Sequence, residues 1–447
     1  MPDWPSCNLV WSGACLFKNK NVADFRPSQD ANGSFQLSGI ELGLDVNTVS
    51  IPYGSGKTRG QGHLLNSAYE KQESIEAPSN MDSFNMHELK VVDGGESALH
   101  LLWKPEYIDV SELGLEQQAG WVGNMGFREV DIASGKTITE WWSLDHIPLS
   151  ESSWPVEGLA GPSPIAWDYL HATSVDKGPD GNYLLSSRHT NCVYKIASHD
   201  SSVMWRLGGF NSSFDLRGMA FARQHDAHFL LASDIHRKAE RGVEYVSLFD
   251  NSGDEHNDEA SPSSMLLLQL NTNNMEATMV RRDIRPDGGV TRIGGNGQVL
   301  RNGNTFVNWA ANSLISEHDS AGRTVLEGGF VSLRFSNYRT YKADWQAWPS
   351  MEELALKCVA RGTSALKSTT VCHVSWNGAT EVRRWQFHQG EDETFALAMD
   401  VGRDGFETSG QWSGFSPEVF VEAVDSEGLV LGTTSQEVEV PRHWPSR

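Results

Sequence analysis

The sequence predicts an all-β protein in which a β-propeller precedes a smaller C-terminal β-sandwich. Short strand–turn–strand units recur along most of the chain, and no stretch shows helical periodicity of useful length. The composition agrees, since 16 Trp and 42 Gly are typical of a protein with many strands and tight turns. A chain of 447 residues is long enough for a large repeat domain followed by a second domain.

The repeated unit is an apolar strand, a short polar turn and a second strand that ends on a large apolar residue. Clear copies span residues 129–141, 193–205 and 314–326, and weaker copies begin at Leu268 and His63. Hairpin turns at Asp180-Gly181 and Asn302-Gly303 precede two of the copies. We therefore expect each copy to mark one four-stranded antiparallel blade, with about six blades if the chain ends share one.

The pattern changes near Trp345, where the repeats give way to short alternating strands. These strands begin at Leu356, Val371, Trp385, Thr394 and Val419. About 90 residues with five or more strands fit an immunoglobulin-like β-sandwich. The expected domains are residues 1–345 for the propeller and 350–443 for the sandwich.

The charge and hydropathy patterns exclude several classes of partner. The formal net charge is −22, which repels nucleic acid and anionic membrane surfaces. No run of about 18 apolar residues occurs, so no membrane span is expected. The first residues, Met1 to Pro5, do not form a signal peptide. We nevertheless expect a secreted protein or one of the secretory pathway, because an acidic surface and the cysteine pattern fit that environment.

Five cysteines form two locally spaced pairs and one single residue. Cys358 with Cys372, and Cys7 with Cys15, are expected to form disulfides in a secreted protein, which leaves Cys192 free and buried in a strand. Asn32 and Asn211 each begin an N-glycosylation sequon.

Four polar segments contain the residues best suited to catalysis or substrate binding. They are Met86-His87-Glu88, residues 167–171, Ser187-Arg188-His189, and residues 223–226. Since the innermost strands of a propeller converge on its axis, residues at matching places in different blades meet there. Histidine and arginine together bind oxyanions, move protons or supply a nucleophile. A single histidine in a β-protein is more often structural, and the matching positions are what favour a shared site.

No cofactor and no metal are expected. His225, Asp226 and His228 could ligate a metal, but neither H-x-H nor H-E-x-x-H occurs. The absence of G-x-S-x-G excludes an α/β-hydrolase.

At these residues the chain resembles the fungal branch of the arylsulfotransferase-like β-propellers, from about Leu9 to the C-terminus. The segments that carry the resemblance are residues 141–151, 167–176, 181–190 and 224–226, with 375–382 in the sandwich. In the bacterial relatives a histidine carries a sulfuryl group between two phenols without PAPS. The resemblance implies that His225 is this nucleophile, that His171 and Arg188 clamp the sulfate, and that His87 is a further active-site residue.

Two departures from the bacterial motif weaken that implication. Thr173 stands where the bacterial motif has Asn, and His228 stands where Arg is more usual. Some similar fungal propellers are hetero-Diels–Alderases of tropolone–sesquiterpene biosynthesis. They dehydrate a hydroxymethyl tropolone to a quinone methide and guide its addition to a humulene-type alkene. The altered motif and the fungal features place this cycloaddition first, with aryl sulfotransfer as the alternative.

The cycloaddition requires a polar side for the tropolone oxygens and an apolar wall for the terpene. His171, Arg188 and His225 are the expected polar contacts. The expected substrate-binding residues are Phe127, Trp167, Tyr169, His189, Gln224, Gln298 and Trp309. A third hypothesis is a non-catalytic secreted propeller that binds glycans or partners, which would have a shallow polar rim instead of a convergent His/Arg set.

Overall fold

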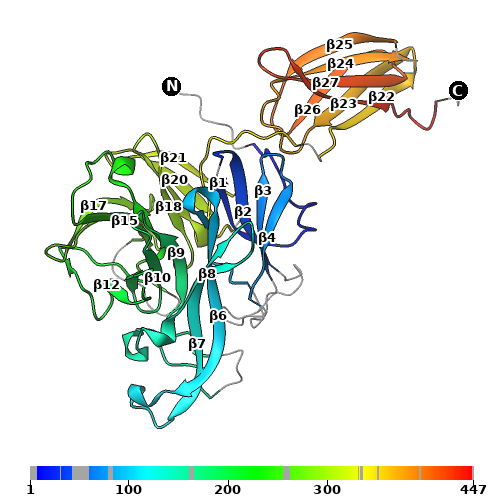
Figure 1. The fold of residues 1–447 in the computed structure, drawn as a ribbon. Coiled ribbons are helices and arrows are strands. Elements are labelled where there is room, and N and C mark those ends of the chain that lie inside the picture. The colour runs from blue at the N-terminus through cyan, green and yellow to red at the C-terminus, as the bar shows by residue number, and fades with distance from the viewer. Residues whose placement is uncertain are drawn as a thin grey trace. The chain divides into compact units, whose positions relative to one another are not determined.

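The computed structural model describes residues 8–30, 32–42, 60–78, 84–160, 166–254, 262–330, 332, 336–349, 352–391 and 394–444. Within them the protein is all-β, as the sequence predicts, and the helical segments are 3-10 turns without any α-helix (Figure 1). The turns are η1 (Asp93–Gly95), η2 (Ser111–Leu113), η3 (Ser143–Asp145), η4 (Leu149–Glu151), η6 (Ala232–Ile235) and η7 (Ala310–Asn312). No helix of the described residues is long and apolar enough to cross a membrane.

The chain forms two compact units. The larger unit contains Lys20–Leu64 and Gln72–Ala343, and the smaller contains Met1–Asn19, Leu65–Lys71 and Asp344–Arg447. The larger unit ends at Ala343, close to the predicted boundary at residue 345. Two earlier segments, Met1–Asn19 and Leu65–Lys71, also belong to the smaller unit. The predicted domain limits, 1–345 and 350–443, stay predictions.

Five sheets account for the strands up to residue 329. They are β1 (Val22–Gln29), β2 (Phe35–Glu41), β3 (Gln61–Asn66) and β4 (Lys71–Ile75); β5 (Leu89–Val92), β6 (Ser97–Asp109), β7 (Ala119–Asp131) and β8 (Thr137–Trp142); β9 (Ala172–Lys177), β10 (Tyr183–Ser187), β11 (Cys192–Ile196) and β12 (Val203–Gly208); β13 (Asp215–Leu216), β14 (His225–Leu230), β15 (Val243–Asp250), β16 (Ser264–Asn271) and β17 (Glu276–Ile284); and β18 (Asn296–Val299), β19 (Thr305–Trp309), β20 (Leu314–His318) and β21 (Thr324–Gly329).

Each predicted repeat falls at the same place in one of these sheets. The copies occupy the hairpins β3–β4, β7–β8, β11–β12, β16–β17 and β20–β21. The Asp180-Gly181 and Asn302-Gly303 turns join β9 to β10 and β18 to β19, and their glycines have φ values of 79° and 82° that an L side chain rarely adopts. A sixth blade stays a prediction.

One sheet departs from the expected four strands. The short strand β13 pairs in parallel with β17 at the sheet edge, where Asp215 lies opposite Glu276. This extra pairing satisfies backbone groups that an edge strand would otherwise expose.

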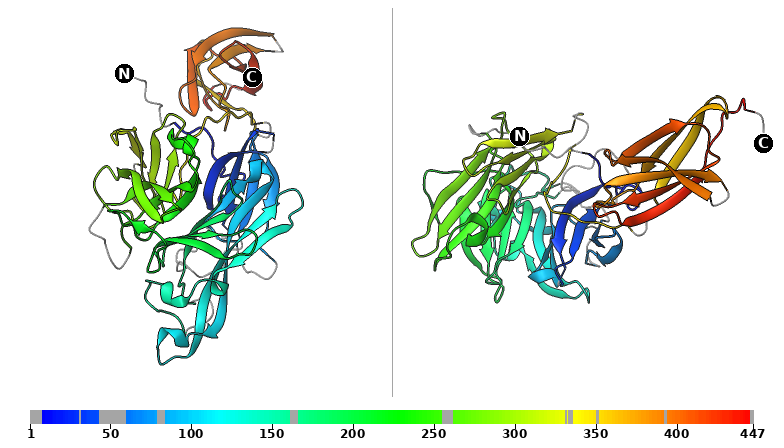
Figure 2. Two further views of the ribbon diagram at one scale, coloured as in Figure 1. Left: turned by 60° about the vertical axis from the view of Figure 1, so that its left-hand side comes forward. Right: turned by 90° about the horizontal axis from the view of Figure 1, so that it is seen from above.

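The first strands of successive sheets lie beside one another. β9 contacts β5 and β14, and β14 contacts β18. Figure 2 shows these sheets of the larger unit from two further sides. Buried hydrophobic clusters fill the spaces between neighbouring sheets, one around Phe127 and Tyr194 and another around Phe249 and Trp309. Side chains at the ends of the first strands are thereby held between rigid layers.

The smaller unit has two sheets that contribute to one hydrophobic cluster. The sheets contain β22 (Ala355–Ser364), β23 (Lys367–Ser375) and β26 (Glu407–Ser413); and β24 (Arg384–Glu391), β25 (Thr394–Gly402), β27 (Glu418–Val424) and β28 (Val430–Glu437). Trp385 and Phe387 of one sheet and Cys358 and Cys372 of the other belong to the shared cluster. Cys358 lies opposite Cys372 in the β22–β23 ladder, and the predicted disulfide between them is present.

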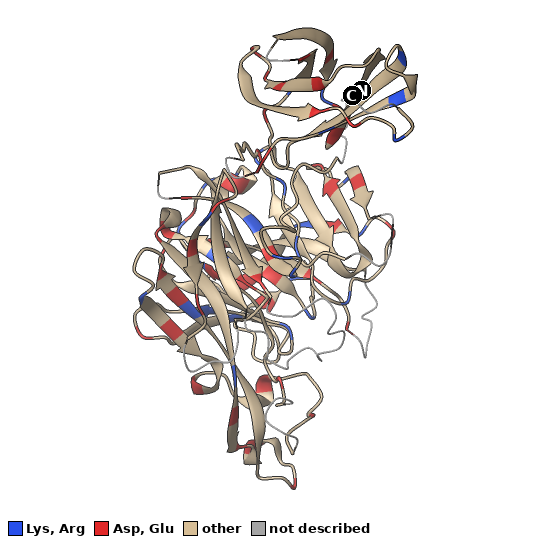
Figure 3. Ribbon diagram, turned by 90° about the vertical axis from the view of Figure 1, so that its right-hand side faces the viewer, with Lys and Arg blue, Asp and Glu red and all other residues tan. Residues whose placement is uncertain are grey.

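The remaining covalent predictions have mixed outcomes. Cys192 is a free, buried thiol at the start of β11, as predicted. Cys15 is an exposed free thiol, so the structure contains no Cys7–Cys15 bond, and Cys7 lies outside the described residues. Asn32 and Asn211 are exposed, and their glycosylation stays a prediction. Acidic residues, red in Figure 3, occur along the ribbon of both units.

Candidate active site

The four polar segments lie at the ends of strands in neighbouring sheets. His87 precedes β5, His171 precedes β9, Arg188 follows β10, and His225 begins β14. Because β9 contacts both β5 and β14, these side chains converge. The backbone is strained here, since the non-glycine residues His171, Arg223 and Asp226 have φ values of 52°, 59° and 54°.

Aromatic contacts link the histidines. The His87 and His171 rings are edge-on with centroids 5.1 Å apart, and the His189 ring centroid is 4.7 Å from that of His171. On its other side His189 stacks on Trp154 at 4.0 Å. We call His87, His171, Arg188, His189 and His225 the His/Arg cluster.

His225 is the most enclosed of the expected catalytic residues, with 2% of its surface exposed. Its Nδ1 lies 2.7 Å from Asn251 Oδ1 and 3.2 Å from the carbonyl oxygen of Arg223. A backbone carbonyl only accepts hydrogen bonds, so Nδ1 carries the proton and Nε2 keeps a lone pair. Burial, and then the charges of Arg188 and His171, hold the pKa of His225 well below its usual range, so the ring is neutral at neutral pH.

His87 and His189 are also held neutral. Burial and the neighbouring His171 lower the pKa of His87 to about 3, and the same two causes lower the pKa of His189 well below its usual range. His87 Nδ1 lies 2.8 Å from Asn85 Oδ1, and His189 Nδ1 donates to the carbonyl oxygen of Asp168 at 2.5 Å.

His171 is oriented by a carboxylate. Its Nδ1 lies 2.6 Å from Asp168 Oδ2, and its backbone N–H donates to Asp168 Oδ1 at 3.0 Å. Burial alone would raise the pKa of the Asp168 carboxyl, but the bonds to His171 outweigh burial and lower it. A charged carboxylate requires a proton on Nδ1, so His171 Nε2 faces away from Asp168 and is the nitrogen that can exchange a proton with a substrate.

Arg188 supplies the positive charge of the site. It is 5% exposed, donates to the carbonyl oxygen of Arg292 at 3.2 Å, and lies 5.5 Å above the Trp154 ring. Its Nη1 is 3.3 Å from His189 Nε2. A buried guanidinium beside neutral imidazoles is suited to an oxyanion such as sulfate.

The structure thus brings together His87, His171, Arg188, His189 and His225, but it places the other expected substrate contacts elsewhere. Phe127, Trp167 and Tyr169 belong to the hydrophobic cluster between two sheets, and Trp309 belongs to another. The Trp309 indole N–H donates to Ser316, so its polar atom is also used internally. These rings pack the core, and the expected apolar wall has no support from their positions.

The two glutamines also have internal partners. The Gln224 amide donates to the carbonyl oxygens of Ser187 and Cys192, which ties β14 to the neighbouring sheet. Gln298 forms a two-way hydrogen bond with the backbone of Lys342. Their role in substrate binding stays a prediction.

Several site residues were not among those expected from the sequence. Asp168 lies three residues before His171, a spacing that could have marked it. Asn85 lies two residues before His87, and this short spacing could also have marked it. Trp154 and Asn251 carry no sequence signal, because only the packing of loops and the β14–β15 pairing bring them to the cluster.

One group in the cluster has metal-ligand character. Atoms of Asp168, His171 and His189 lie within 4.8 Å of one another. Both Nδ1 atoms, however, are already bonded to Asp168, and the Arg188 guanidinium lies next to His189 Nε2. A cation would be repelled by that charge, so the donor set fits an anion better than a metal.

A separate buried network of charges lies beside the His/Arg cluster. Arg339 bonds to Asp24 and Glu88, each at 3.0 Å, and Arg26 bonds to both of these carboxylates. His228 lies between Asp226 at 2.9 Å and Asp176 at 3.4 Å. We call these residues the ion network.

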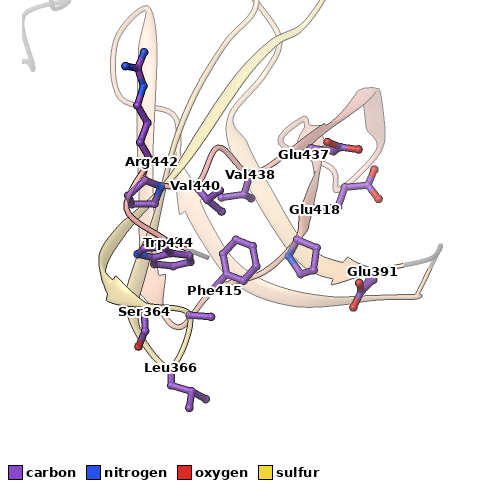
Figure 4. A pocket seen from close by; sticks show the side chains of 13 residues that line it. Ser364, Leu366, Glu391, Phe415, Glu418, Glu437, Val438, Val440, Arg442 and Trp444 are labelled. Carbon is purple, nitrogen blue, oxygen red and sulfur yellow. The ribbon is translucent and has the colours of Figure 1, made fainter. Parts of the chain in front are cut away.

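A pocket in the smaller unit is of another kind. It has a volume of about 1060 Å³ and is lined by Phe415, Val438, Val440 and Trp444, among others. Figure 4 shows glutamates and Arg442 at its margins, and no histidine lines it. This pocket offers carboxylates but not the combination of histidines with a buried arginine that the His/Arg cluster provides.

Comparison with known proteins decides the family. The sequence profile of the family described as Arylsulfotransferase (ASST) matches residues 53–331, which include every member of the His/Arg cluster. The chain belongs to this family. No curated protein matches the chain.

Several solved structures are similar in fold. A protein of unknown function from Bacteroides caccae is 14% identical with a TM-score of 0.36, covering 71% of this chain and 86% of its own. A glycoside hydrolase family 43 arabinoxylan arabinofuranohydrolase from Bacillus subtilis is 10% identical with a TM-score of 0.36, covering 92% and 93%. Virginiamycin B lyase from Staphylococcus aureus is 10% identical with a TM-score of 0.32, covering 70% and 72%.

Proposed function

We propose that this arylsulfotransferase-family protein transfers a sulfuryl group from an aryl sulfate to a phenol through a covalent adduct on His225. The observation that carries the proposal is the state of His225. Its ring is neutral, its Nδ1 proton is held by two oxygen acceptors so that the lone pair is on Nε2, and the Arg188 charge acts on the ring. A neutral imidazole with a lone pair beside a cation is what attack on an anionic sulfate ester requires.

In the first step the Nε2 lone pair of His225 attacks sulfur. The bond between sulfur and the aryl oxygen breaks, and its electron pair leaves with that oxygen, which takes up a proton. Arg188 neutralises charge on the sulfuryl oxygens, and His171, oriented by Asp168, is placed to donate the proton.

In the second step the hydroxyl oxygen of the acceptor phenol attacks sulfur. Its proton passes to His171, and the sulfur–nitrogen bond breaks and returns its electron pair to Nε2. The enzyme is regenerated without a nucleotide donor, because the donor ester supplies the sulfuryl group.

We infer that this chemistry takes place on a β-propeller followed by an immunoglobulin-like sandwich. Five sheets, four of which have first strands in contact through β5, β9, β14 and β18, support the propeller, and two sheets around one core support the sandwich. The disulfide supports an oxidising compartment such as the secretory pathway.

The cycloaddition, which the sequence placed first, becomes the second candidate. One observation favours it. The hydroxyl of Thr173, which stands where the bacterial motif has asparagine, lies 3.0 Å from Ser186 Oγ and 3.2 Å from the Gln224 carbonyl oxygen, so it is engaged inside the protein. Against it, Phe127 and Trp309 lie in hydrophobic cores and do not offer a terpene wall.

One experiment separates these candidates. The protein is incubated with a phenyl sulfate alone, and its intact mass is measured after rapid quenching. The proposal predicts an increase of about 80 Da, the mass of one sulfuryl group, that maps to His225 and disappears when a phenol is added. A protein that stays unmodified, yet joins a hydroxymethyl tropolone to a humulene-type alcohol, would exclude the sulfotransferase in favour of the cycloaddition.

A further inference from the structure

We propose that Asn251 is the positioning residue that keeps His225 in the tautomer with a free Nε2, and that it couples His225 to the support of Arg188. The kinetic consequence of this inference rests on the proposed sulfuryl transfer, whereas the tautomer itself does not. Asn251 is fully buried and stands directly after β15, whose pairing with β14 brings it beside His225.

The orientation of the Asn251 amide follows from its other bonds. Its Nδ2 lies 2.7 Å from the carbonyl oxygen of Thr291 and 2.9 Å from that of Gly294. Both partners only accept hydrogen bonds, so the nitrogen must face them and Oδ1 must face His225. An amide oxygen at 2.7 Å from Nδ1 requires the proton on Nδ1, and the Arg223 carbonyl imposes the same requirement.

The same loop supports the guanidinium of the site. Arg292 lies between the two residues that accept from Asn251, and its carbonyl oxygen accepts from Arg188 at 3.2 Å. Ser263 strengthens this support, because its hydroxyl donates to the Asn251 carbonyl at 2.6 Å and accepts from the Thr291 N–H at 2.7 Å. The nucleophile and the cation are therefore anchored to one short segment, 291–294.

The tautomer matters because the Nδ1 side of the ring is already occupied by protein acceptors. If the proton moved to Nε2, the lone pair would lie on Nδ1 and face Asn251 and the Arg223 carbonyl instead of a substrate. Loss of the correct tautomer at a catalytic histidine is costly in other enzymes that use a histidine base. Without Asn251 the Arg223 carbonyl remains, at a longer distance, as the weaker constraint.

The test measures the tautomer and the kinetics in the same full-length variants. Asn251→Ala removes the acceptor, whereas Asn251→Asp keeps an acceptor and adds a negative charge. Asn124→Ala is the matched control, because Asn124 is a buried amide that bonds to Ser143 and Glu106 and to no histidine. Thermal unfolding of each variant establishes that it folds.

The tautomer is read from long-range proton–nitrogen correlation spectra of protein labelled with ¹⁵N-histidine. The His225 signals are those that vanish in His225→Gln. We expect a protonated Nδ1 and a bare Nε2 in the wild type and in Asn124→Ala. Asn251→Ala should move the proton toward Nε2 and lower kcat roughly 10²-fold with little change in KM.

Asn251→Asp provides the second readout, which a merely structural role would not move. The carboxylate should keep the proton on Nδ1 and raise the pKa of His225 against burial and the opposing charge of Arg188. The acidic limb of the kcat profile should then shift to higher pH. If Asn251→Ala does not fold, Asn251→Asp alone tests the proposal.

The outcomes separate this inference from the proposed function. An unchanged His225 tautomer and unchanged kcat in Asn251→Ala would overturn the positioning role. An altered tautomer in a protein that never transfers a sulfuryl group would uphold the positioning of His225 while overturning the proposed reaction.

Discussion

Two histidines on strand β14, the buried His225 and the half-buried His228, lie three residues apart and have opposite electrostatic environments. His225 meets Arg188, two other histidines and an amide, and burial together with the Arg188 charge lowers its pKa. Burial and the charge of Lys90 lower the pKa of His228, but the charge of Asp226 and the bond to Asp176 outweigh both and raise it. His225 is a neutral ring with a lone pair on Nε2, whereas the pKa of His228 is held above its usual range within the ion network. Burial alone therefore does not decide what a histidine does; the charges that surround it do.

The largest expected effect is at the neutral histidine. His225→Ala should lower kcat/KM for phenyl sulfate and a phenol by roughly 10⁴-fold or more, because no other group replaces the nucleophile. The variant should unfold at nearly the wild-type temperature. Steady-state kinetics check the first result and calorimetry the second. A loss of only about tenfold would mean that His225 is not the nucleophile.

In the ion network, the largest expected effect is a loss of stability. Arg339→Met leaves Asp24 and Glu88 with one partner fewer in a fully buried site. Removing one member of a buried ion pair costs about 3–5 kcal/mol. Urea unfolding of the variant should show this loss. Wild-type stability in Arg339→Met would show that Arg26 alone satisfies the carboxylates.

Arg188 tests the His225 side of this comparison, because it is the cation that lies among the neutral histidines. Arg188→Ala should lower kcat roughly 10²–10³-fold, the usual loss for one donor to a developing oxyanion. Arg188→Lys should restore little, since lysine lacks the planar fork. Arg223→Lys is the control, because Arg223 lies over the same Trp154 ring but is paired with Asp254 at 2.5 Å. Equal losses of kcat in Arg223→Lys and Arg188→Lys would show that Arg188 has no special role.

The smallest effect is the pH dependence of the ion network. His228 has a raised folded pKa, so its contribution to stability is complete below its unfolded pKa of about 6.5 and is lost as pH rises through the folded pKa. His228→Gln should therefore cost about 1–3 kcal/mol at pH 6 and less at pH 9. Denaturant unfolding at both pH values measures the difference. A cost that does not vary with pH would show that His228 is neutral.

Much of the fold was predictable because it repeats. Each strand–turn–strand copy found in the sequence lies in the same hairpin of a successive sheet, and the Asp-Gly and Asn-Gly turns have the backbone they require. The Cys358–Cys372 bond followed from local spacing. The two-residue strand β13 and the grouping of Leu65–Lys71 with the smaller unit were not predictable, because neither leaves a local pattern.

The sequence alone singled out His87, His171, Arg188 and His225 as candidates, since each stands at or beside the end of a strand. It did not determine their protonation, which depends on neighbours from distant segments such as Asn251 and Arg292. It also misled on Phe127 and Trp309, because an aromatic residue in a strand has the same pattern whether it faces a substrate or a core. Only the tertiary structure decided these points, since β-sheet packing places residues far apart in sequence within hydrogen-bond distance, where charge and burial set the chemistry.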